Sequence, residues 1–208
     1  MVSITDVAGG NLYLSTAGRN WATAHALTSS DTSRQTTSSG LVQVNPGGDT
    51  YIYRGVYIFD TSSVPAGSTV TSLILQVYAA GKYTAPVGAK SDLVVCYNVA
   101  HPSSLAVGEF DWSYYDGKAA GAKAWIDITA GVYNDISLDV AAMNCGGTTT
   151  YALLSYADYI NASTTDDGNY YGIGIQGPVA ANPPKLVVLY TPKKSGNNAF
   201  AVRGSRAW

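Results

Sequence analysis

The chain has 208 residues, of which 46% are hydrophobic and 12% are charged, and its formal net charge is −2. This apolar content is ample for a buried core and excludes an intrinsically disordered protein. The absence of a basic excess argues against broad nucleic-acid binding.

The residue usage favours strands over helices. The sequence contains a single Glu and sixteen Tyr, is rich in Thr, Ser, Gly and Val, and has few strong helix formers other than Ala. Met1 is followed by VSITDVAGG, which is neither basic nor apolar, so no secretory signal is visible. No apolar run approaches the roughly 20 residues of a membrane helix. We therefore expect no membrane insertion. The expected location is a virion or an extracellular surface, with release from the cell by lysis as one route. The alternative explanations for the missing signal are that it has been removed or that the sequence is a cloned fragment.

The first fifty residues are expected to hold two strands, at residues 11–15 and 41–45. Between them, residues 17–39 are polar and rich in Ser and Thr, which predicts a long surface loop with a short helical turn around residues 21–27. The sequence Pro-Gly-Gly-Asp at positions 46–49 predicts a turn.

Residues 54–78 form the stretch around which we expect the fold to be organised. The alternation of side chains predicts a β-hairpin, with strands at residues 54–60 and 70–78 and a connection at residues 61–69 that contains Pro65 and Gly67. In the first strand, Val56 and Ile58 are expected on one face and Gly55, Tyr57 and Phe59 on the other. In the second strand, Leu73, Leu75 and Val77 are expected to share a face.

The second half of the chain alternates between strands and loops. Loops are expected at residues 79–90 and at the aromatic segment 110–118, and one helical turn is expected at residues 141–147. The predicted strands are residues 92–99, 124–129, 135–140, 151–156, 171–176 and 185–191.

Nine or ten short strands separated by turn signals predict an all-β fold, an antiparallel two-sheet β-sandwich (jelly roll) with extended terminal arms. We expect one sandwich domain over residues 1–192, of which the first 40 or so are rich in loops, followed by a C-terminal arm at residues 193–208.

Several segments resemble one family of modules. Residues 54–78 (RGVYIFDTSSVPAGSTVTSLILQVY) resemble the strand pair of DNRLRE-type, carbohydrate-binding-like jelly-roll modules, and residues 182–191 (NPPKLVVLYT) are similar to the closing strand of that family. Residues 133–140 and 151–156 look like a divergent set of these modules found in phage and environmental-virus structural proteins. The resemblance implies a binding or structural module and implies no active site.

The aromatic loop is the best candidate for a small ligand. Flat rings beside carboxylates suit sugars, because a ring covers apolar C–H groups while Asp accepts hydroxyl hydrogen bonds. The alternative is that these rings pack on the end of the sandwich or on another subunit. The tentative carbohydrate-binding set is Asp111, Trp112, Tyr114, Tyr115 and Asp116.

The C-terminal arm differs in charge from the rest of the chain. Residues 1–192 hold 8 basic and 14 acidic side chains, a net of −6, whereas residues 193–208 hold four basic residues and no acid. Basic groups with interspersed apolar residues predict an arm that anchors one subunit to another, and a frayed tail is the alternative. The arm residues expected to act are Lys193, Lys194, Phe200, Arg203, Arg206 and Trp208.

Residues suited to catalysis or metal binding are sparse. His25 and His101 lie in polar contexts and read as ordinary surface histidines. Glu109 and the scattered Asp residues form no recognisable acid–base pair. We expect no cofactor; calcium at Asp166, Asp167 and Asn169 is a weak alternative to a solvated loop. Cys96 and Cys145 either form a disulfide or remain two free thiols.

We therefore expect a non-enzymatic structural protein of a virion or surface assembly, a decoration, fibre or tail-type subunit that associates with itself or with other structural proteins through its arms. The alternative is a carbohydrate-binding or receptor-binding module that recognises a surface glycan through the aromatic loop. An enzyme, such as a glycan lyase or hydrolase, is the least favoured class.

Overall fold

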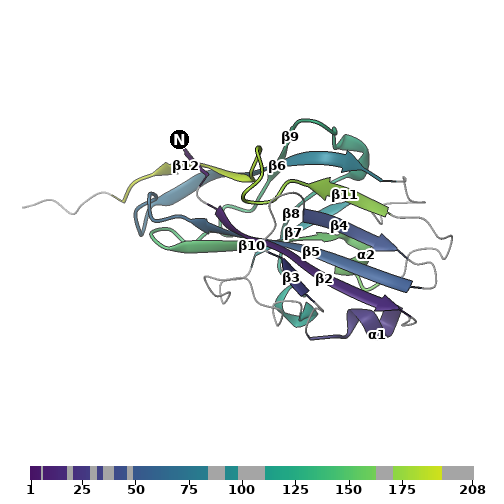
Figure 1. Ribbon diagram of the computed structural model, residues 1–208. Helices are drawn as coiled ribbons and strands as arrows, with labels where there is room; N and C mark the ends of the chain where they lie inside the picture. The colour runs from purple at the N-terminus through teal and green to yellow at the C-terminus, as the bar shows by residue number, and fades with distance from the viewer. Residues whose placement is uncertain are drawn as a thin grey trace, which may run out of the picture.

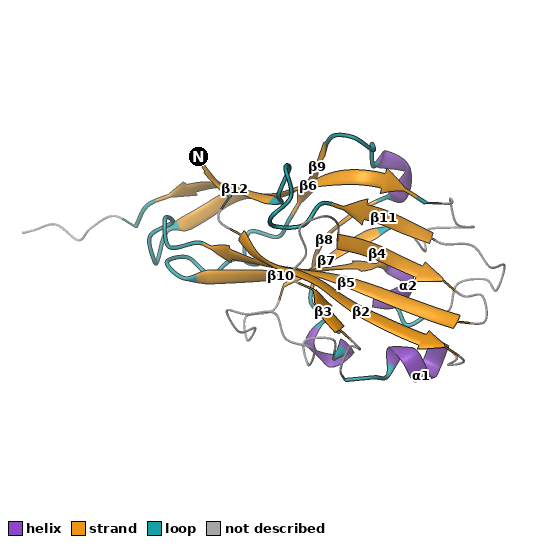
Figure 2. Cartoon of the chain, viewed as in Figure 1, coloured by secondary structure: helices purple, strands orange, loops and turns teal. Residues whose placement is uncertain are grey.

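The computed structural model describes residues 1–5, 7–17, 21–28, 32–34, 40–45, 49–83, 92–97, 111–162 and 171–193. These residues form two antiparallel β-sheets that pack face to face (Figures 1 and 2), so the predicted all-β, two-sheet sandwich is confirmed. No helix in this part of the chain has the length and apolar character needed to cross a membrane.

The smaller sheet contains the two ends of the described chain. Its strand order is β1-β12-β6-β9, so the first and last strands are neighbours. The strands are β1 (Val2–Ile4), β6 (Thr69–Lys82), β9 (Tyr133–Ser137) and β12 (Lys185–Thr191).

The larger sheet runs in the order β11-β4-β5-β10-β7-β8, and β2 pairs with the whole length of β5 and with β3. Its strands are β2 (Val7–Ala17), β3 (Thr32–Arg34), β4 (Gly40–Asn45), β5 (Asp49–Asp60), β7 (Leu93–Tyr97), β8 (Ala119–Lys123), β10 (Thr148–Ser155) and β11 (Tyr171–Ile175).

The two sheets are joined along both sides. The long strand β6 pairs with β12 and β9 in the smaller sheet, and its last residues pair with β11 of the larger sheet. On the other side, β8 lies against the end of β9, where the Asp139 N–H donates to the Ala120 carbonyl at 2.8 Å. This β8–β9 contact leaves no room for a side chain at Gly121, whose Cβ would lie 2.5 Å from the Ser137 carbonyl oxygen.

The expected β-hairpin at residues 54–78 is wrong, because β5 and β6 belong to different sheets. β5 pairs with β2, β4 and β10, whereas β6 pairs with β9, β11 and β12. The connection is held at the crossing by Thr61, whose hydroxyl lies 2.6 Å from the Asn144 carbonyl oxygen, and Gly67 turns with a φ of +78°. The crossing places the inner faces of both strands in one core.

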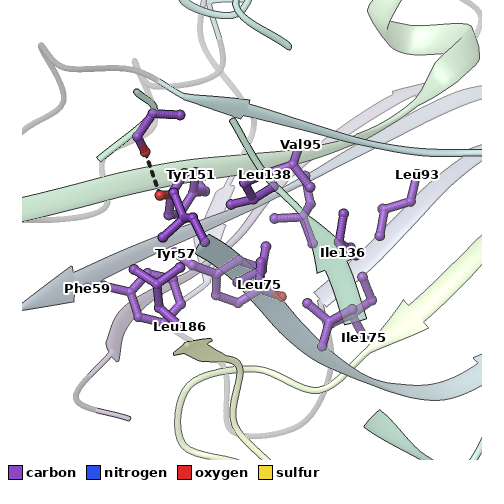
Figure 3. Close-up of a cluster of buried hydrophobic side chains, with 14 of the residues drawn as sticks. Tyr57, Phe59, Leu75, Leu93, Val95, Ile136, Leu138, Tyr151, Ile175 and Leu186 are labelled. Atoms are coloured by element: carbon purple, nitrogen blue, oxygen red, sulfur yellow. Dashed lines mark hydrogen bonds between the residues drawn. The ribbon is translucent and has the colours of Figure 1, made fainter. Parts of the chain in front are cut away.

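The main core lies between the sheets (Figure 3). The predicted faces are confirmed: Tyr57 and Phe59 from β5 meet Leu73, Leu75 and Val77 from β6. Burying each such side chain stabilises the fold by about 1.5–3 kcal/mol. One polar group is satisfied within this core, since the Tyr151 hydroxyl donates to the Ala142 carbonyl at 2.6 Å.

A second, smaller core covers the outer face of the larger sheet. Short elements lie on this face: α1 (Trp21–His25), the 3-10 helix η3 (Trp112–Tyr114) with the turn after it, and α2 (Tyr156–Tyr159). The helical turn expected near residues 21–27 is thus confirmed. The buried members of the second core are Ala24, Ile52, Val56, Val94, Cys96, Tyr115, Ala152 and Leu154.

Some expected elements differ from the structure. The strand predicted at residues 124–129 is a 3-10 helix, η4 (Trp125–Asp127), because the Asp92 carboxylate accepts from the Trp125 N–H at 2.7 Å and Asn134 holds the end of this segment at Thr129. Residues 79–82 continue β6 instead of forming a loop, and residues 141–147 form turns instead of a helical turn. Of the turn expected at residues 46–49, residues 46–48 lie outside the described residues and Asp49 begins β5.

Candidate functional site

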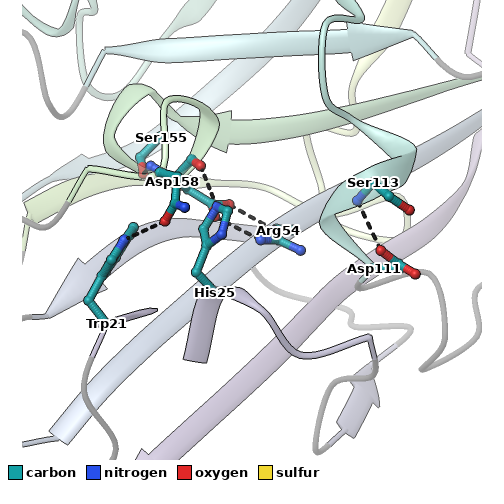
Figure 4. Close-up of polar contacts among 8 residues, drawn as sticks. Trp21, His25, Arg54, Asp111, Ser113, Ser155 and Asp158 are labelled. Atoms are coloured by element: carbon teal, nitrogen blue, oxygen red, sulfur yellow. Dashed lines mark hydrogen bonds and ion pairs between the residues drawn. The ribbon is translucent and has the colours of Figure 1, made fainter. Parts of the chain in front are cut away.

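A buried ion pair joins Arg54 and Asp158 (Figure 4). Arg54 lies on the outer face of β5, between Ile52 and Val56, with a side chain that is 0% exposed. Its Nε donates to Asp158 Oδ2 and its Nη2 to Oδ1, both at 2.8 Å. This two-point geometry fixes the guanidinium and the carboxylate in one plane and is the strong form of the interaction.

Asp158 is positioned by the short helix α2, which follows β10 directly. Ser155 is the N-cap of this helix, and its Oγ accepts from the Asp158 N–H at 3.2 Å. A carboxylate in the first turn of a helix is also favoured by the orientation of the peptide dipoles. The backbone of α2 therefore holds Asp158 above the sheet, where Arg54 reaches it.

His25 brings α1 to the same point. Its Nε2 lies 2.8 Å from the Asp158 carbonyl oxygen and 3.4 Å from Asp158 Oδ1. The Trp21 ring stacks on the imidazole with centroids 5.8 Å apart, and the Trp21 Nε1 donates to Asn161 Oδ1 at 3.0 Å. We call His25, Arg54 and Asp158 the clasp, because they join α1, β5 and α2.

Burial dominates the electrostatics of the clasp. It lowers the pKa of His25 from its ordinary value, and the attraction of Asp158 offsets this only in part. The imidazole is therefore neutral at pH 7, and the clasp holds one anion and one cation. Burial, followed by the charge of Asp158, raises the pKa of Cys96 to about 12, so this nearby thiol stays protonated.

The geometry of the clasp favours a role in stabilising the fold. An acid–base residue must reach a substrate proton within hydrogen-bond distance, yet the side chains of the clasp are at most 5% exposed. What the clasp does in this structure is to hold the two short helices over the second core.

The expectation that His25 is a surface histidine is wrong, since it is buried in this clasp. His101 lies outside the described residues. The sequence contains one signal for the clasp: Arg54 shares a strand face with Ile52 and Val56, and a charged residue on an apolar face requires a buried partner. Nothing in the sequence pattern identifies that partner as Asp158.

The predicted carbohydrate-binding set is only partly on the surface. Tyr115 is 0% exposed, and its ring lies 5.6 Å from Arg54 Cζ in the second core, so it is unavailable for stacking on a sugar. Tyr114 is 39% exposed and Asp116 is also exposed. Asp111 accepts from the Ser113 N–H at 2.9 Å (Figure 4), and the Trp112 side chain lies outside the described part of the structure.

Of the predicted assembly arm, only Lys193 is described. Its side chain packs over Gly67 in the β5–β6 connection, at a distance of 3.0 Å from the position that a Cβ would occupy there. Lys194, Phe200, Arg203, Arg206 and Trp208 lie outside the described residues, as do Asp166, Asp167 and Asn169 of the weak calcium candidate.

Cys96 and Cys145 are both free thiols, which resolves the two alternatives left by the sequence. Cys96 faces the second core and Cys145 packs against the main core on the other side of the sheet. Within the described ranges, no group of three or more His, Cys, Asp or Glu side chains could hold a metal ion.

In comparisons with known proteins, no family model and no curated protein sequence matches this chain.

Proposed function

We propose that this protein is a non-catalytic structural subunit of a virion or another surface assembly, and that its C-terminal arm joins one copy to the next. The observation that carries this proposal is the contrast between a sandwich that closes at β12 and the cationic sequence that follows it.

The position of β12 supports this reading. β12 pairs with β6 along Lys185–Thr191 and with β1 at Leu186–Val188, so the middle of the strand is bonded on both edges. Lys193 leaves the sheet beside Gly67, at the end of the sandwich where the β5–β6 connection crosses. The arm therefore starts from a fixed point on the body.

The charge distribution supports an intermolecular role. The body carries a net charge of −6 and the arm carries four basic residues without an acid. Opposite charges steer association, and Trp and Arg are the residues that most often dominate an interface energetically. Phe200 and Trp208 would supply the apolar contacts.

The clasp adds indirect support. The described side chains best suited to acid–base work are buried and occupied in holding the fold together, which favours a binding or structural role.

The test compares the full chain with a variant that ends at Lys193. Sedimentation velocity at about 50 μM and at two salt concentrations should show an oligomer for the full chain and a monomer for the truncated variant, with weaker association at high salt because salt screens exposed charges. A full-length variant with the four basic arm residues replaced by Gln is the matched control for charge without loss of length.

Circular dichroism must show that the truncated body still folds. A full chain that is monomeric at this concentration would overturn the proposal, and so would a truncated variant that keeps the same oligomeric state.

A glycan-binding module is the second candidate, favoured by the exposure of Tyr114 and Asp116 on one short segment. Binding of the full chain to a glycan array, abolished by Trp112→Ala or Tyr114→Ala, would establish this function. A Tyr115→Phe variant is a suitable control because that ring is buried.

A further inference from the structure

The outer face of the smaller sheet carries a group of polar and aromatic side chains. Where β6, β9 and β12 pair with one another, every second residue is buried, and the residues between them point away from the main core. The short helices α1 and α2 lie over the larger sheet and do not cover this face (Figure 1). Five of its side chains are neighbours, and we call them the outer site: Gln76, Tyr78, Tyr133, Asp135 and Lys185.

Strand pairing sets the arrangement of the outer site. Gln76 in β6 lies opposite both Asp135 in β9 and Lys185 in β12, so these three residues form a row across three strands. Two residues further along β6, Tyr78 lies opposite Tyr133. Opposite residues on one face of a sheet have Cβ atoms about 5 Å apart. The outer site is therefore built on strands, which hold its members at fixed spacings.

The two rings of the outer site are held in place by their neighbours. The Tyr133 hydroxyl donates to the Pro183 carbonyl at 3.0 Å, and the centroids of Tyr133 and Tyr78 are 5.6 Å apart with an interplanar angle of 82°. Both side chains are partly exposed. A ring that is already fixed loses little conformational entropy when a ligand packs on it, and aromatic surfaces suit the apolar C–H groups of a pyranose.

The charged groups of this face keep capacity for a ligand. Gln76 Nε2 donates to Asp135 Oδ1 at 2.8 Å, whereas Lys123, at the end of β8, donates to the Asp135 carbonyl at 3.0 Å and not to its carboxylate. Lys185 forms no ion pair within the described ranges, and its Nζ lies 4.1 Å from the centroid of the Tyr133 ring. Two ammonium groups and one carboxylate give this face a local charge of +1, although residues 1–192 carry a net charge of −6.

We propose that the outer site binds an acidic saccharide, a chain that contains uronic acid residues. The rings pack on pyranose C–H groups, Lys185 and Lys123 pair with sugar carboxylates, and Asp135 accepts hydrogen bonds from hydroxyl groups. A neutral saccharide would leave both ammonium groups without a counter-charge. This inference does not depend on the assembly function, because it uses no residue of the C-terminal arm, and the outer site lies on the other sheet from the Tyr114 segment.

The probe is a tetramer of galacturonic acid, and the neutral tetramer maltotetraose is its control. Isothermal titration calorimetry of the full chain should give a Kd below about 1 mM for the acidic tetramer and at least tenfold weaker binding of maltotetraose. The proposal would be overturned if the acidic tetramer did not bind, or if the two tetramers bound with equal affinity.

The matched variants are Lys185→Glu and Lys118→Glu, which change the net charge by the same amount on different sheets. Affinity for the acidic tetramer should fall at least tenfold in Lys185→Glu and less than twofold in Lys118→Glu, whose side chain is exposed at the end of the aromatic segment. Tyr78→Ala should weaken binding at least fivefold, and Tyr114→Ala should leave it unchanged. Equal losses in the two lysine variants would mean that net charge alone governs binding and would contradict the outer site. A loss confined to Lys118→Glu and Tyr114→Ala would place the saccharide on the aromatic segment instead.

Amide chemical shifts of the isotope-labelled, unmutated chain provide a readout that does not depend on the folding of any variant. Addition of the acidic tetramer should shift residues 74–78, 133–137 and 185–187, and shifts confined to residues 111–118 would overturn the proposal. Sedimentation velocity of Lys185→Glu should show the oligomeric state of the parent, so that a failure of the outer site is distinguished from a failure of assembly through the arm.

Discussion

Arg54 and Asp158 lie 104 positions apart in the chain and meet through two hydrogen bonds of 2.8 Å in a site that is closed to water. Each of the two charges offsets the cost of burying the other. A buried ion pair contributes little compared with an apolar pair of the same volume, but the loss of one partner leaves a bare charge.

Asp158→Asn should therefore lower the free energy of unfolding by about 3–5 kcal/mol, because the Arg54 guanidinium loses the negative charge of Asp158 while it stays buried. Urea denaturation monitored by circular dichroism measures the change. The double variant Arg54→Met/Asp158→Leu should recover most of the loss. Asp116→Asn, at an exposed position of the same face, should stay within about 0.5 kcal/mol of the parent. A similarly small effect of Asp158→Asn would mean that Arg54 finds water or another partner.

The pKa of His25 predicts a pH dependence of stability. Because its folded-state pKa lies below the ordinary value of 6.5, the unfolded chain binds the proton more readily, and protonation favours unfolding. The folding stability that depends on neutral His25 is fully present above pH 6.5 and is lost as the pH falls towards the folded-state pKa.

Urea denaturation between pH 7.5 and pH 4.5 should show this decline in the parent and a much flatter curve in His25→Gln. Asp60 acts at lower pH: the Ser62 N–H lowers the pKa of its carboxyl below 3.8, so its contribution is lost only in stronger acid. Identical curves for parent and variant down to pH 4.5 would rule out His25 as the titrating group.

Alternation of side chains was sufficient to predict most of the strands. β6 and β12 each have one apolar face, and both faces are found in the main core as expected, whereas β5 is buried on both faces. The same pattern could not reveal that β5 and β6 lie in different sheets, because the periodicity of a strand is the same whichever neighbour it bonds to. The AWIDIT segment shows a second limit, since the Asp92 carboxylate accepts from the Trp125 N–H and a 3-10 helix forms where alternation suggested a strand.

The clasp was harder to predict than the fold. Arg54, His25 and Asp158 come from three distant segments, and a polar surrounding in sequence made His25 resemble a surface residue. Tyr115 follows the packing alternative that was left open for the aromatic loop: a ring in a turn can face solvent or the sheet, and only the packing beside Arg54 decides between them.

Two buried tyrosines of the main core should respond in opposite ways to loss of the hydroxyl. The Tyr151 hydroxyl donates to the Ala142 carbonyl at 2.6 Å, so Tyr151→Phe should lower the free energy of unfolding by about 1–2 kcal/mol. The Tyr57 hydroxyl is buried with no hydrogen-bond partner among the described residues, so Tyr57→Phe should be neutral or stabilising.

Both variants keep the ring and the apolar contacts, which makes each the control of the other in thermal and urea denaturation. A loss of more than about 1 kcal/mol in Tyr57→Phe would show that this hydroxyl has a partner, such as a buried water molecule.

The contact between β8 and β9 can be tested with a single methyl group. A Cβ at Gly121 would lie 2.5 Å from the Ser137 carbonyl oxygen and 2.7 Å from Leu138 Cδ2, so Gly121→Ala requires the backbone of one strand to move. Overpacking of this kind costs about 1–3 kcal/mol. The loss should appear as a lower urea midpoint together with faster hydrogen exchange at Asp139, whose N–H bonds to Ala120 across the contact.

Gly81→Ala in β6 is the control, because no atom lies within 4 Å of its Cβ position, and it should unfold at the same midpoint as the parent or slightly above it. Equal midpoints for the two variants would mean that β8 and β9 are far enough apart in solution to admit a side chain, and that the two sheets are joined along the β6 side alone.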